Sequence, residues 1–135
     1  MSHHTKIALI TGAAKRVGQV IALELAAAGW DIAIHYGKSK EEASSVIASI
    51  EKMGRKAIGI EADLANEQEV RQILPNCISQ LGIPNCLVNN AALFEYDAPD
   101  NFQTNKFEAH LKVNLMAPLI LSEQLYHLYQ QSTEN

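Results

Sequence analysis

The residues with the clearest chemical potential lie in a glycine-containing turn, Thr11–Gly18, near the start of the chain. The apolar run Ile7–Ile10 precedes this turn and an Ala- and Leu-rich segment follows it, so the turn joins a predicted buried strand to a predicted helix. At such a junction, free backbone N–H groups and the positive end of the helix dipole can bind the pyrophosphate of a dinucleotide. The turn therefore predicts a nicotinamide-nucleotide site. Its expected contacts are Gly12, Lys15, Arg16, Val17 and Gly18.

A second group of residues, at the end of the next predicted strand, indicates which nicotinamide nucleotide is preferred. A site for NAD requires a carboxylate there, because it accepts hydrogen bonds from the ribose hydroxyls and repels a 2′-phosphate. Here Tyr36 ends the strand and Lys38 and Ser39 follow. Asp31 lies at the opposite end. Hydroxyl donors and cations favour a phosphate, so we expect NADP(H), with Lys15 adding a second positive charge. If Lys38 and Lys15 are only solvated surface lysines, this preference loses its basis.

Composition limits the class of protein. The 135 residues, 47% of them hydrophobic, are expected to form one partial NADP-binding domain spanning 1–135. The net charge of −4 and the absence of a basic stripe argue against nucleic acid as a partner. The longest apolar run, Leu115–Leu121, is far shorter than the ~20 residues that span a bilayer, and the first five residues contain no hydrophobic leader. We therefore expect a cytoplasmic protein with a small-molecule substrate and no membrane partner.

Cysteine and histidine residues do not indicate a metal site. Cys77 and Cys86 stand nine residues apart, without a second cysteine pair or a cluster of histidines. A zinc site needs more ligands than these two thiols, so we expect both to be reduced packing residues. His35, on the second predicted strand, is expected to contribute through its backbone rather than through its ring.

Hydrophobic periodicity places these residues on alternating strands and helices. Short apolar or β-rich runs predict strands at 6–10, 31–36, 57–61 and 83–90. Helical spacing predicts helices that begin at 16, 40, 67 and 105, the last of them running to 129. Strands that alternate with helices form parallel βαβ units with right-handed crossovers. The predicted fold is a doubly wound, Rossmann-type α/β sheet in three α/β/α layers, with strand order 3-2-1-4 and the ligand at the carboxyl edge of strands 1 and 4.

Local signals predict where the helices begin, which faces they bury and where they bend. Capping boxes are predicted for the pairs Ser39–Glu42, Asn66–Glu69 and Asn105–Glu108. The first helix is expected to bury Val17, Ile21, Leu25 and Ala28, and the second to bury Ala43, Val46, Ile47 and Ile50. Pro75 falls inside the third helix and is expected to kink or split it.

Four motifs, in order along the chain, resemble those of the short-chain dehydrogenase/reductase family. They are the turn Thr11–Gly18, the pair Asp63-Leu64, the run Asn89-Asn90-Ala91-Ala92 and the pair Val113-Asn114. The resemblance covers essentially the whole chain and implies a nicotinamide-dependent oxidoreductase. It implies that Asp63 and Leu64 flank the adenine of the cofactor. It also implies that Asn90 and Ala91 bind the cofactor, and that Asn114 is the active-site asparagine.

Pro118 bears on how Asn114 would act. Proline lacks the N–H that bonds the carbonyl four residues earlier, and that carbonyl belongs to Asn114. In the family this carbonyl holds a water that links the catalytic lysine to solvent. The resemblance therefore implies that Pro118 frees the carbonyl for a proton relay.

Two departures from the family pattern narrow the resemblance. Arg16 replaces the middle glycine of the turn, and Ala92 replaces the last glycine of the fourth-strand motif. Together with the stretch His35–Ser39, these departures resemble pteridine reductases and related dihydropteridine-reducing enzymes. The resemblance implies that Arg16 holds pyrophosphate and substrate, and that Phe94 stacks on a pterin. The implied reaction is the NADPH-dependent reduction of a carbonyl or pterin-like substrate.

The proton-donating residues of the family are not found in this sequence. They are a serine and a tyrosine with a lysine four residues later, located on the fifth strand and the helix after it. Tyr36 and Lys40 have this spacing, but they end a strand and begin a helix, so they cannot lie on consecutive helical turns. We expect the chain to stop before the fifth strand, to supply the cofactor-binding half and to be inactive alone. The alternative is a non-catalytic nucleotide-binding or interaction protein that is complete at residue 135.

The edge of the fourth strand has a consequence for assembly. A sheet that ends there exposes an apolar edge, which proteins usually cover. A separate remainder of the protein could cover it, or the chain could self-associate. We expect a homo-oligomer formed through the long helix 105–129, which the resemblance implies as a dimer contact, or through the exposed strand edge.

Overall fold

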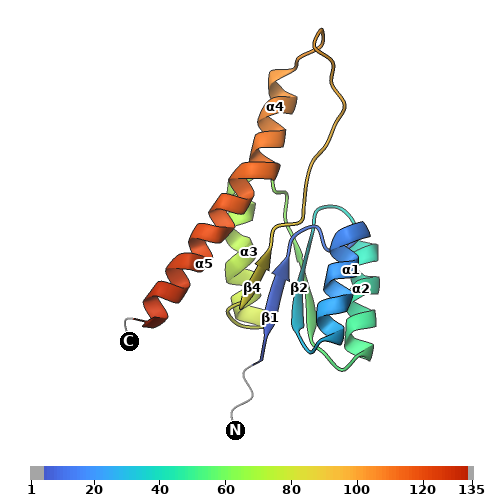
Figure 1. Cartoon of the computed structure of the whole chain (residues 1–135), viewed down its shortest axis with the longest axis vertical. Coiled ribbons are helices and arrows are strands. Elements are labelled where there is room, and N and C mark those ends of the chain that lie inside the picture. Colours follow the sequence, from blue (N-terminus) through green and yellow to red (C-terminus); the bar gives the residue numbers. More distant parts are fainter. Residues whose placement is uncertain (1–4, 134–135) are drawn as a thin grey trace.

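The computed structural model describes residues 5–133 and contains a parallel sheet of four strands in the order β3-β2-β1-β4 (Figure 1). The strands are β1 (Ile7–Ile10), β2 (Asp31–Tyr36), β3 (Ala57–Glu61) and β4 (Cys86–Val88). This order confirms the predicted doubly wound topology, in which the chain reverses direction across the sheet between β1 and β4. Residues 1–4, where no hydrophobic leader is expected, lie outside the described residues.

β4 is shorter than the predicted strand 83–90 because the residues on both sides of it make other contacts than strand pairing. Pro84 has no N–H for a strand ladder. The Asn85 side chain accepts a hydrogen bond from the Ile7 N–H at 2.9 Å, before the strand begins. After the strand, the Asn90 N–H turns back to the Val88 carbonyl at 3.1 Å. Only the central residues of the run pair with β1.

Helices cover both faces of the sheet and form the three predicted layers (Figure 1). α1 (Arg16–Ala27) and α2 (Lys40–Lys52) pack on one face, and α3 (Glu67–Gln80) and α5 (Ala117–Thr133) pack on the other. In β1, Leu9 belongs to the core under α3 and α5, whereas Ile10 belongs to the core under α1 and α2. Successive side chains thus enter different cores, as expected for a strand buried on both faces.

The buried face of α1 differs from the prediction, whereas that of α2 largely agrees with it. α1 fully buries Gly18, Ala22 and Ala26, while the predicted Ile21 and Leu25 are partly buried against the same core and Ala28 is exposed. Val17 is 65% exposed. The reason is steric, because small residues let the helix axis approach the sheet and leave the larger residues at the sides of the contact. α2 buries Ala43, Val46 and Ile50 as predicted, with Ile47 partly buried.

The capping box predicted at the start of α3 forms by half. The Asn66 side chain accepts hydrogen bonds from the N–H groups of Gln68 and Glu69 at 3.0 and 3.3 Å. The Glu69 carboxylate does not return to Asn66, because it accepts from the Asp63 N–H at 3.2 Å. The cap therefore also holds the loop that follows β3.

The other two predicted capping boxes do not form. Ser39 precedes α2, but its hydroxyl makes no cap hydrogen bond. Glu42 instead pairs with Lys15 at 3.7 Å. Asn105 does not act as a cap, because the helix begins one residue earlier, at Thr104, and Asn105 therefore lies inside it.

Pro75 does not split α3, which continues from Glu67 to Gln80. Proline lacks the N–H that would bond the Arg71 carbonyl, four residues earlier. In this fold Gln124 of α5 donates its amide N–H to that carbonyl at 3.3 Å. A side chain of another helix thus replaces the missing bond, and only the tertiary structure provides it.

A helical rod leads from the far end of the molecule back to the sheet (Figure 1). It consists of α4 (Thr104–Leu111), the π-helical turn η1 (Lys112–Met116) and α5. The predicted single helix 105–129 is therefore interrupted by a wider turn, in which the Ala117 N–H bonds to the carbonyl of Lys112. Pro118 provides a reason, since it cannot donate to the carbonyl of Asn114.

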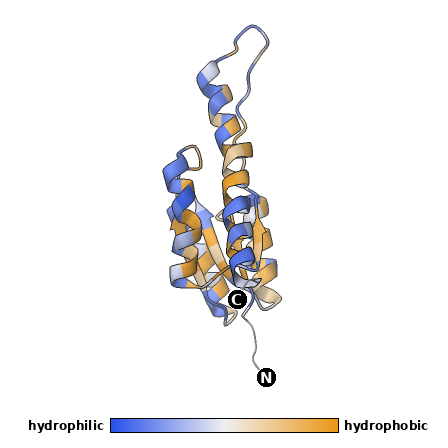
Figure 2. Cartoon of the chain, turned by 90° about the vertical axis from the view of Figure 1, so that its left-hand side faces the viewer, coloured by the Kyte–Doolittle hydropathy of each residue, from blue (hydrophilic) through white to orange (hydrophobic). Residues whose placement is uncertain are grey.

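The helical rod has a surface of mixed hydropathy. Figure 2, viewed from the α5 side, shows hydrophobic and hydrophilic residues interspersed along the rod. Among residues 5–133, no helix is both long and apolar enough to cross a membrane.

Both cysteines are free thiols, and burial raises the pKa of Cys77 to about 11, so it remains a neutral packing residue.

Candidate cofactor-binding site

The glycine turn lies at the carboxyl edge of the sheet, where the strand order reverses between β1 and β4 (Figure 1). Doubly wound folds bind their ligands in the crevice at this point. The Thr11 N–H donates to the Val88 carbonyl at 3.0 Å and ties the turn to β4. A groove of about 350 Å³ opens here. Its lining residues are Gly12, Lys15, Arg16, Val17, Asn90, Ala91 and Ala92, so the fold brings the predicted turn and the fourth-strand motif together.

Thr11 fixes the junction between the turn and β4, although the sequence did not single it out as a site residue. Its side chain is almost fully buried, with the residue 2% exposed. The hydroxyl oxygen accepts hydrogen bonds from the N–H groups of Asn90 and Ala91, each at 3.0 Å. It also donates to the Val88 carbonyl at 3.4 Å. A polar residue that ends an otherwise apolar strand was the available signal.

Asn90 holds the turn in shape from the opposite side of the groove. Its side-chain N–H₂ group donates to the carbonyls of Thr11 and Gly12, both at 3.1 Å. These bonds satisfy two carbonyl groups that would otherwise lack partners at the turn. Asn90 and Ala91 are therefore positioning residues of the turn, and their direct contact with the cofactor stays a prediction.

The two glycines of the turn are required by space. Gly12 has a φ of +62°, and an added Cβ would lie 3.0 Å from the Ala91 Cα. At Gly18 an added Cβ would collide with the Gly12 carbonyl oxygen and lie 2.9 Å from the Ala13 Cα. A side chain at either position would therefore collide with neighbouring protein atoms of the turn or of the segment after β4. The two glycines therefore allow the turn to pack closely against the segment after β4 at the start of α1, which is the packing that a dinucleotide-binding turn requires.

The two cations of the turn have different surroundings. Arg16 adopts a φ of +53°, the left-handed conformation that the glycine of the family pattern would adopt without cost. Its side chain lines the groove. Lys15 also lines the groove, but its ammonium group pairs with Glu42 of α2 at 3.7 Å. Part of its charge is therefore compensated within the protein, unlike the expectation from sequence.

His35 contributes through its ring, which corrects the expectation that only its backbone matters. The residue is 2% exposed. Its Nδ1 accepts a hydrogen bond from the Gly12 N–H at 3.0 Å, and its Nε2 lies 2.9 Å from the Ala62 carbonyl oxygen. Burial lowers the pKa of His35, and the hydrogen bond to Ala62 offsets this in part. A histidine in an apolar strand that points toward the ligand edge was the signal in the sequence.

The end of β2 carries the residues predicted to recognise a 2′-phosphate. Tyr36 is the last residue of β2, and Lys38 is exposed just beyond it. Asp31 is buried at the other end of the strand, where Arg55 binds its carboxylate at 2.8 Å, so it cannot reach the ribose. Glu61, the register partner of Tyr36 on β3, brings one carboxylate to the same edge.

The start of α2 adds a second group of donors near Lys38. The Ser39 hydroxyl caps none of the free N–H groups in the first turn of this helix. Those N–H groups and the positive end of the helix dipole favour an anion. The start of α2 is thus chemically suited to a phosphate, and the contact of Ser39 with the cofactor stays a prediction.

Asp63 and Leu64 lie in the loop after β3 but differ in accessibility. The Asp63 carboxylate accepts a hydrogen bond from the Ala65 N–H at 2.9 Å and remains exposed. Leu64 is 8% exposed and belongs to the core under α3 and α5. Its side chain serves packing, while its predicted position beside the adenine stays a prediction.

Asn114 holds the segment after β4 against the rod. Its side chain accepts from the Leu93 N–H at 2.7 Å and donates to the Leu93 carbonyl at 2.9 Å. The side chain is thus a structural clamp in the π-helical turn η1. The predicted proton relay involves the backbone carbonyl of Asn114 and stays a prediction.

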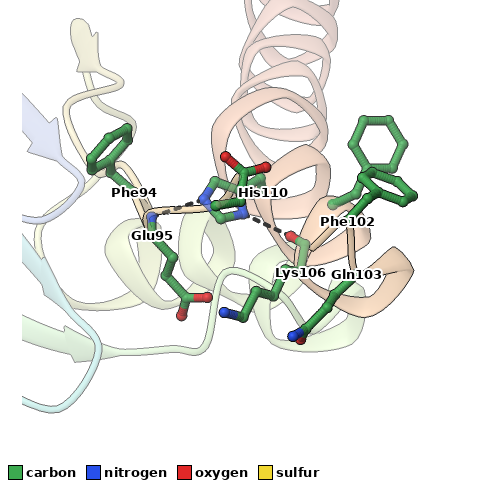
Figure 3. Close-up of a pocket in the computed structure, with 8 residues that line it drawn as sticks. Phe94, Glu95, Phe102, Gln103, Lys106 and His110 are labelled. Carbon is green, nitrogen blue, oxygen red and sulfur yellow. Dashed lines mark hydrogen bonds between the residues drawn. The ribbon is translucent and has the colours of Figure 1, made fainter. Parts of the chain in front are cut away.

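Phe94 lies in a second cavity, of about 190 Å³, between the segment after β4 and α4. In Figure 3 the His110 ring lies between Glu95 and Lys106, where it accepts from the Glu95 N–H at 3.1 Å and bonds the Lys106 carbonyl at 2.7 Å. Phe94 is 74% exposed and contacts Tyr96 edge to face. Arg16 lines the groove at the turn, so the two residues predicted to contact substrate line different cavities.

Comparisons with known proteins identify the family and the fold. The family model described as "short chain dehydrogenase" matches residues 6–134. The 3-oxoacyl-[acyl-carrier-protein] reductase FabG of Staphylococcus aureus is 40% identical over 89 residues, which are 66% of this chain and 36% of the reductase.

Two solved structures with NADP have similar folds. FolM Alternative dihydrofolate reductase 1 from Brucella suis, in complex with NADP, matches with a TM-score of 0.84 and 32% identity over 89% of this chain and 50% of that one. A short chain dehydrogenase from Burkholderia cenocepacia, in complex with NADP, matches with a TM-score of 0.87 and 39% identity over 90% of this chain and 50% of that one. The chain thus spans about half the length of these solved chains.

Proposed function

Because the chain belongs to the short-chain dehydrogenase family, we propose that it supplies the NADPH-binding half of a reductase. The proposed reaction is the reduction of a carbonyl or a pterin-like C=N bond. When bound, the reduced nicotinamide would supply the hydride. The residues of this chain bind and orient the cofactor.

The turn between β1 and α1 carries this proposal. Both glycines allow the turn to pack closely against its neighbours, and Asn90 and Thr11 fix the backbone groups of the turn and of the segment after β4. Gly12 donates its N–H to His35 and accepts from Asn90, so its own polar groups are already used. We infer that the phosphates are bound by the N–H groups at the start of α1 and by Arg16, while Gly12 and Gly18 shape the turn.

The preference for NADPH over NADH rests on the charges at the end of β2. Lys38, the Ser39 hydroxyl and the uncapped start of α2 supply a cation and hydrogen-bond donors for a 2′-phosphate. The carboxylate that an NAD site needs at this strand end is replaced by Tyr36. The Glu61 carboxylate on β3 would repel a 2′-phosphate at this edge, so the attraction of Lys38 for the phosphate must exceed this repulsion. Two similar solved structures contain NADP.

The substrate class is proposed from the aromatic cavity and from one neighbour. Phe94 presents an exposed ring that could stack on a flat heterocycle. The similar FolM structure is described as an alternative dihydrofolate reductase, and dihydrofolate contains a pterin ring. Because Arg16 and Phe94 line different cavities, this proposal requires one substrate to reach both residues.

We further propose that residues 1–135 alone do not catalyse the reduction, because a proton donor is needed in addition to the cofactor site. The single Tyr-x-x-x-Lys spacing, Tyr36 and Lys40, joins the end of β2 to the first residue of α2. The two side chains therefore do not lie on consecutive helical turns, where a lysine could lower the pKa of a tyrosine proton donor. NADPH binding without oxidation of NADPH is the expected behaviour.

A titration of NADPH and NADH, followed by nicotinamide fluorescence, tests the cofactor assignment. NADPH should bind at least about tenfold more tightly, because one charge-assisted contact to a phosphate contributes about 1.5–3 kcal/mol. Lys38→Glu should abolish or reverse the preference. Lys52→Glu, at the far end of α2, is the charge-matched control and should retain it. Equal affinities of the unmodified chain for both nucleotides would refute the assignment.

A further inference from the structure

His35 joins three segments that lie far apart in the sequence. Its ring accepts the Gly12 N–H in the turn at 3.0 Å and reaches the Ala62 carbonyl after β3 at 2.9 Å. Its backbone carbonyl accepts the Ala13 N–H at 3.0 Å. Ala62 immediately precedes Asp63, the residue expected beside the adenine. One buried residue thus fixes the turn relative to the loop after β3.

The two partners of the ring determine its protonation state. A backbone N–H can only donate, so the Nδ1 that faces Gly12 must carry no proton. A carbonyl can only accept, so the Nε2 that faces Ala62 must carry the proton. The arrangement therefore selects one neutral tautomer. A second proton would place two N–H groups against each other at Gly12 and break the contact that orients the turn.

No charged side chain compensates a positive ring at this position. The burial and hydrogen-bond causes described above account for the lowered pKa of His35, without any charged neighbour. The charged or titratable groups are Lys15 and Arg16 on the turn, Tyr36 and Lys38 at the end of β2, Glu61 at the end of β3, Asp63 in the loop after it, Glu67, Glu69 and Arg71 at the start of α3, and Lys112 on η1. Tyr36 is partly buried and the others are exposed, and within residues 5–133 none of them forms a hydrogen bond or ion pair with the imidazole.

We propose that His35 is a positioning residue for the phosphate-binding turn, and that protonation of its ring weakens cofactor binding by releasing Gly12. The part that concerns the cofactor rests on the proposed function, whereas the control of the turn by the ring does not. Affinity should fall with decreasing pH below the ordinary histidine pKa of 6.5, since His35 takes up its proton only below that value.

His35→Asn separates the proton from the hydrogen bond. The asparagine Oδ1 can accept the Gly12 N–H as Nδ1 does, but it does not titrate. His35→Leu removes the acceptor at every pH. NADPH affinity is measured from about pH 7.5 to about pH 5 for the three forms, so that the range extends below the ordinary histidine pKa of 6.5. The 2′-phosphate of NADPH also titrates near pH 6, as phosphate monoesters do, and the asparagine variant corrects for it.

The expected result is a steeper loss for the unmodified chain. Its affinity should fall at least about tenfold more than that of His35→Asn over this range, as the loss of a hydrogen bond by a buried group implies. His35→Leu should bind weakly throughout and show the shallow profile of the asparagine variant. Parallel profiles for the unmodified chain and His35→Asn would overturn the proposal.

Nuclear magnetic resonance of the unliganded chain provides a measurement that does not depend on the cofactor or on a folded variant. The Gly12 amide resonance should shift with the same midpoint as the His35 ring carbons, and the ring nitrogens should show the Nε2–H tautomer. A Gly12 resonance that does not follow the ring would overturn the proposal. If the two titrate together while NADPH fails to bind at any pH, the positioning role stands and the proposed function fails.

Discussion

At the residue scale, the buried polar side chains of this fold fasten loops rather than line the groove. Among residues 5–133, Thr11, Asp31 and His35 are the polar residues that are buried. Thr11 and His35 hold the turn at the ligand edge, as described above. Asp31 acts at the other edge, where its Oδ1 accepts from the Lys56 N–H at 2.9 Å and from Arg55. Thr11 and His35 form hydrogen bonds with backbone groups of neighbouring segments, whereas Asp31 binds one backbone N–H and the Arg55 side chain.

Arg16 gives a prediction at this scale because its backbone is strained. A left-handed conformation costs a non-glycine residue about 1–2 kcal/mol, and glycine is free of this cost. Arg16→Gly should therefore raise the free energy of unfolding by about 0.5–1 kcal/mol, after the larger chain entropy of glycine is subtracted. NADPH binding should weaken at the same time, because the guanidinium is lost. Urea denaturation and nucleotide titration measure the two effects.

A matched control uses the same type of substitution where the backbone is relaxed. Gln19 lies inside α1. Gln19→Gly should lower the free energy of unfolding by about 0.5–1 kcal/mol, as glycine does in a helix interior. If Arg16→Gly destabilises the chain as much as Gln19→Gly, the strain at Arg16 has no energetic consequence.

At the scale of elements, side-chain clamps join the rod to the segment that follows β4. Asn114 in η1 binds both backbone groups of Leu93, and His110 in α4 accepts the Glu95 N–H. The π-helical turn places Asn114 one turn beyond His110 on the rod. The segment 93–95 has no strand partner of its own, so these side chains provide its hydrogen bonds.

Removing one clamp should loosen this segment locally. Asn114→Ala deletes both hydrogen bonds to Leu93, which are worth about 1 kcal/mol each. Amide hydrogen exchange at Leu93 should accelerate at least about tenfold, while exchange in β1 and β2 should change little. Asn105→Ala, on the exposed side of α4, is the control. Unchanged protection at Leu93 would show that other contacts hold the segment.

At the scale of the whole molecule, two apolar surfaces remain uncovered within the described residues. β4 forms one edge of the sheet and pairs only with β1. Along the rod, Leu115 and Leu119 are 54% and 61% exposed. Burial of such residues between two copies of the chain would remove apolar surface from water. We propose a homo-oligomer, with the rod as the contact.

A charge on the rod should separate the copies. Leu119→Glu should convert the assembly into monomers, because it places a carboxylate in the proposed contact. Sedimentation velocity measures the change, and far-ultraviolet circular dichroism should remain the same. Val20→Glu is the control, since Val20 is 59% exposed on α1, on the other face of the sheet. The contact would be contradicted if the unmodified chain sediments as a monomer. It would also be contradicted if the Leu119→Glu variant sediments as the same oligomer as the unmodified chain.

The parts of the fold that were predicted correctly depend on short-range patterns. The runs that became β1, β2 and β3 are bounded by turn residues, and the buried face of α2 follows helical spacing. The strand order followed from the alternation of strands and helices, together with the position of the glycine turn. The predicted capping box at Ser39 failed because Glu42 pairs with Lys15 of another element. The prediction for α1 was only partly correct, because the close approach of helix and sheet selects small residues at the centre of the contact and leaves Ile21 and Leu25 at its sides.

Patterns within a few residues were therefore enough to predict the glycine turn, the alternation of strands and helices behind the doubly wound sheet, and the ionic character of the end of β2. The packed fold was needed to find that the His35 ring holds the turn, that Gln124 bonds the carbonyl left free by Pro75, and that Arg16 and Phe94 line separate cavities. The physical reason is that a buried polar group takes its partner from whichever segment the packed core brings within hydrogen-bond distance. Those partners lie 23 and 53 residues away along this chain, beyond the reach of any local pattern.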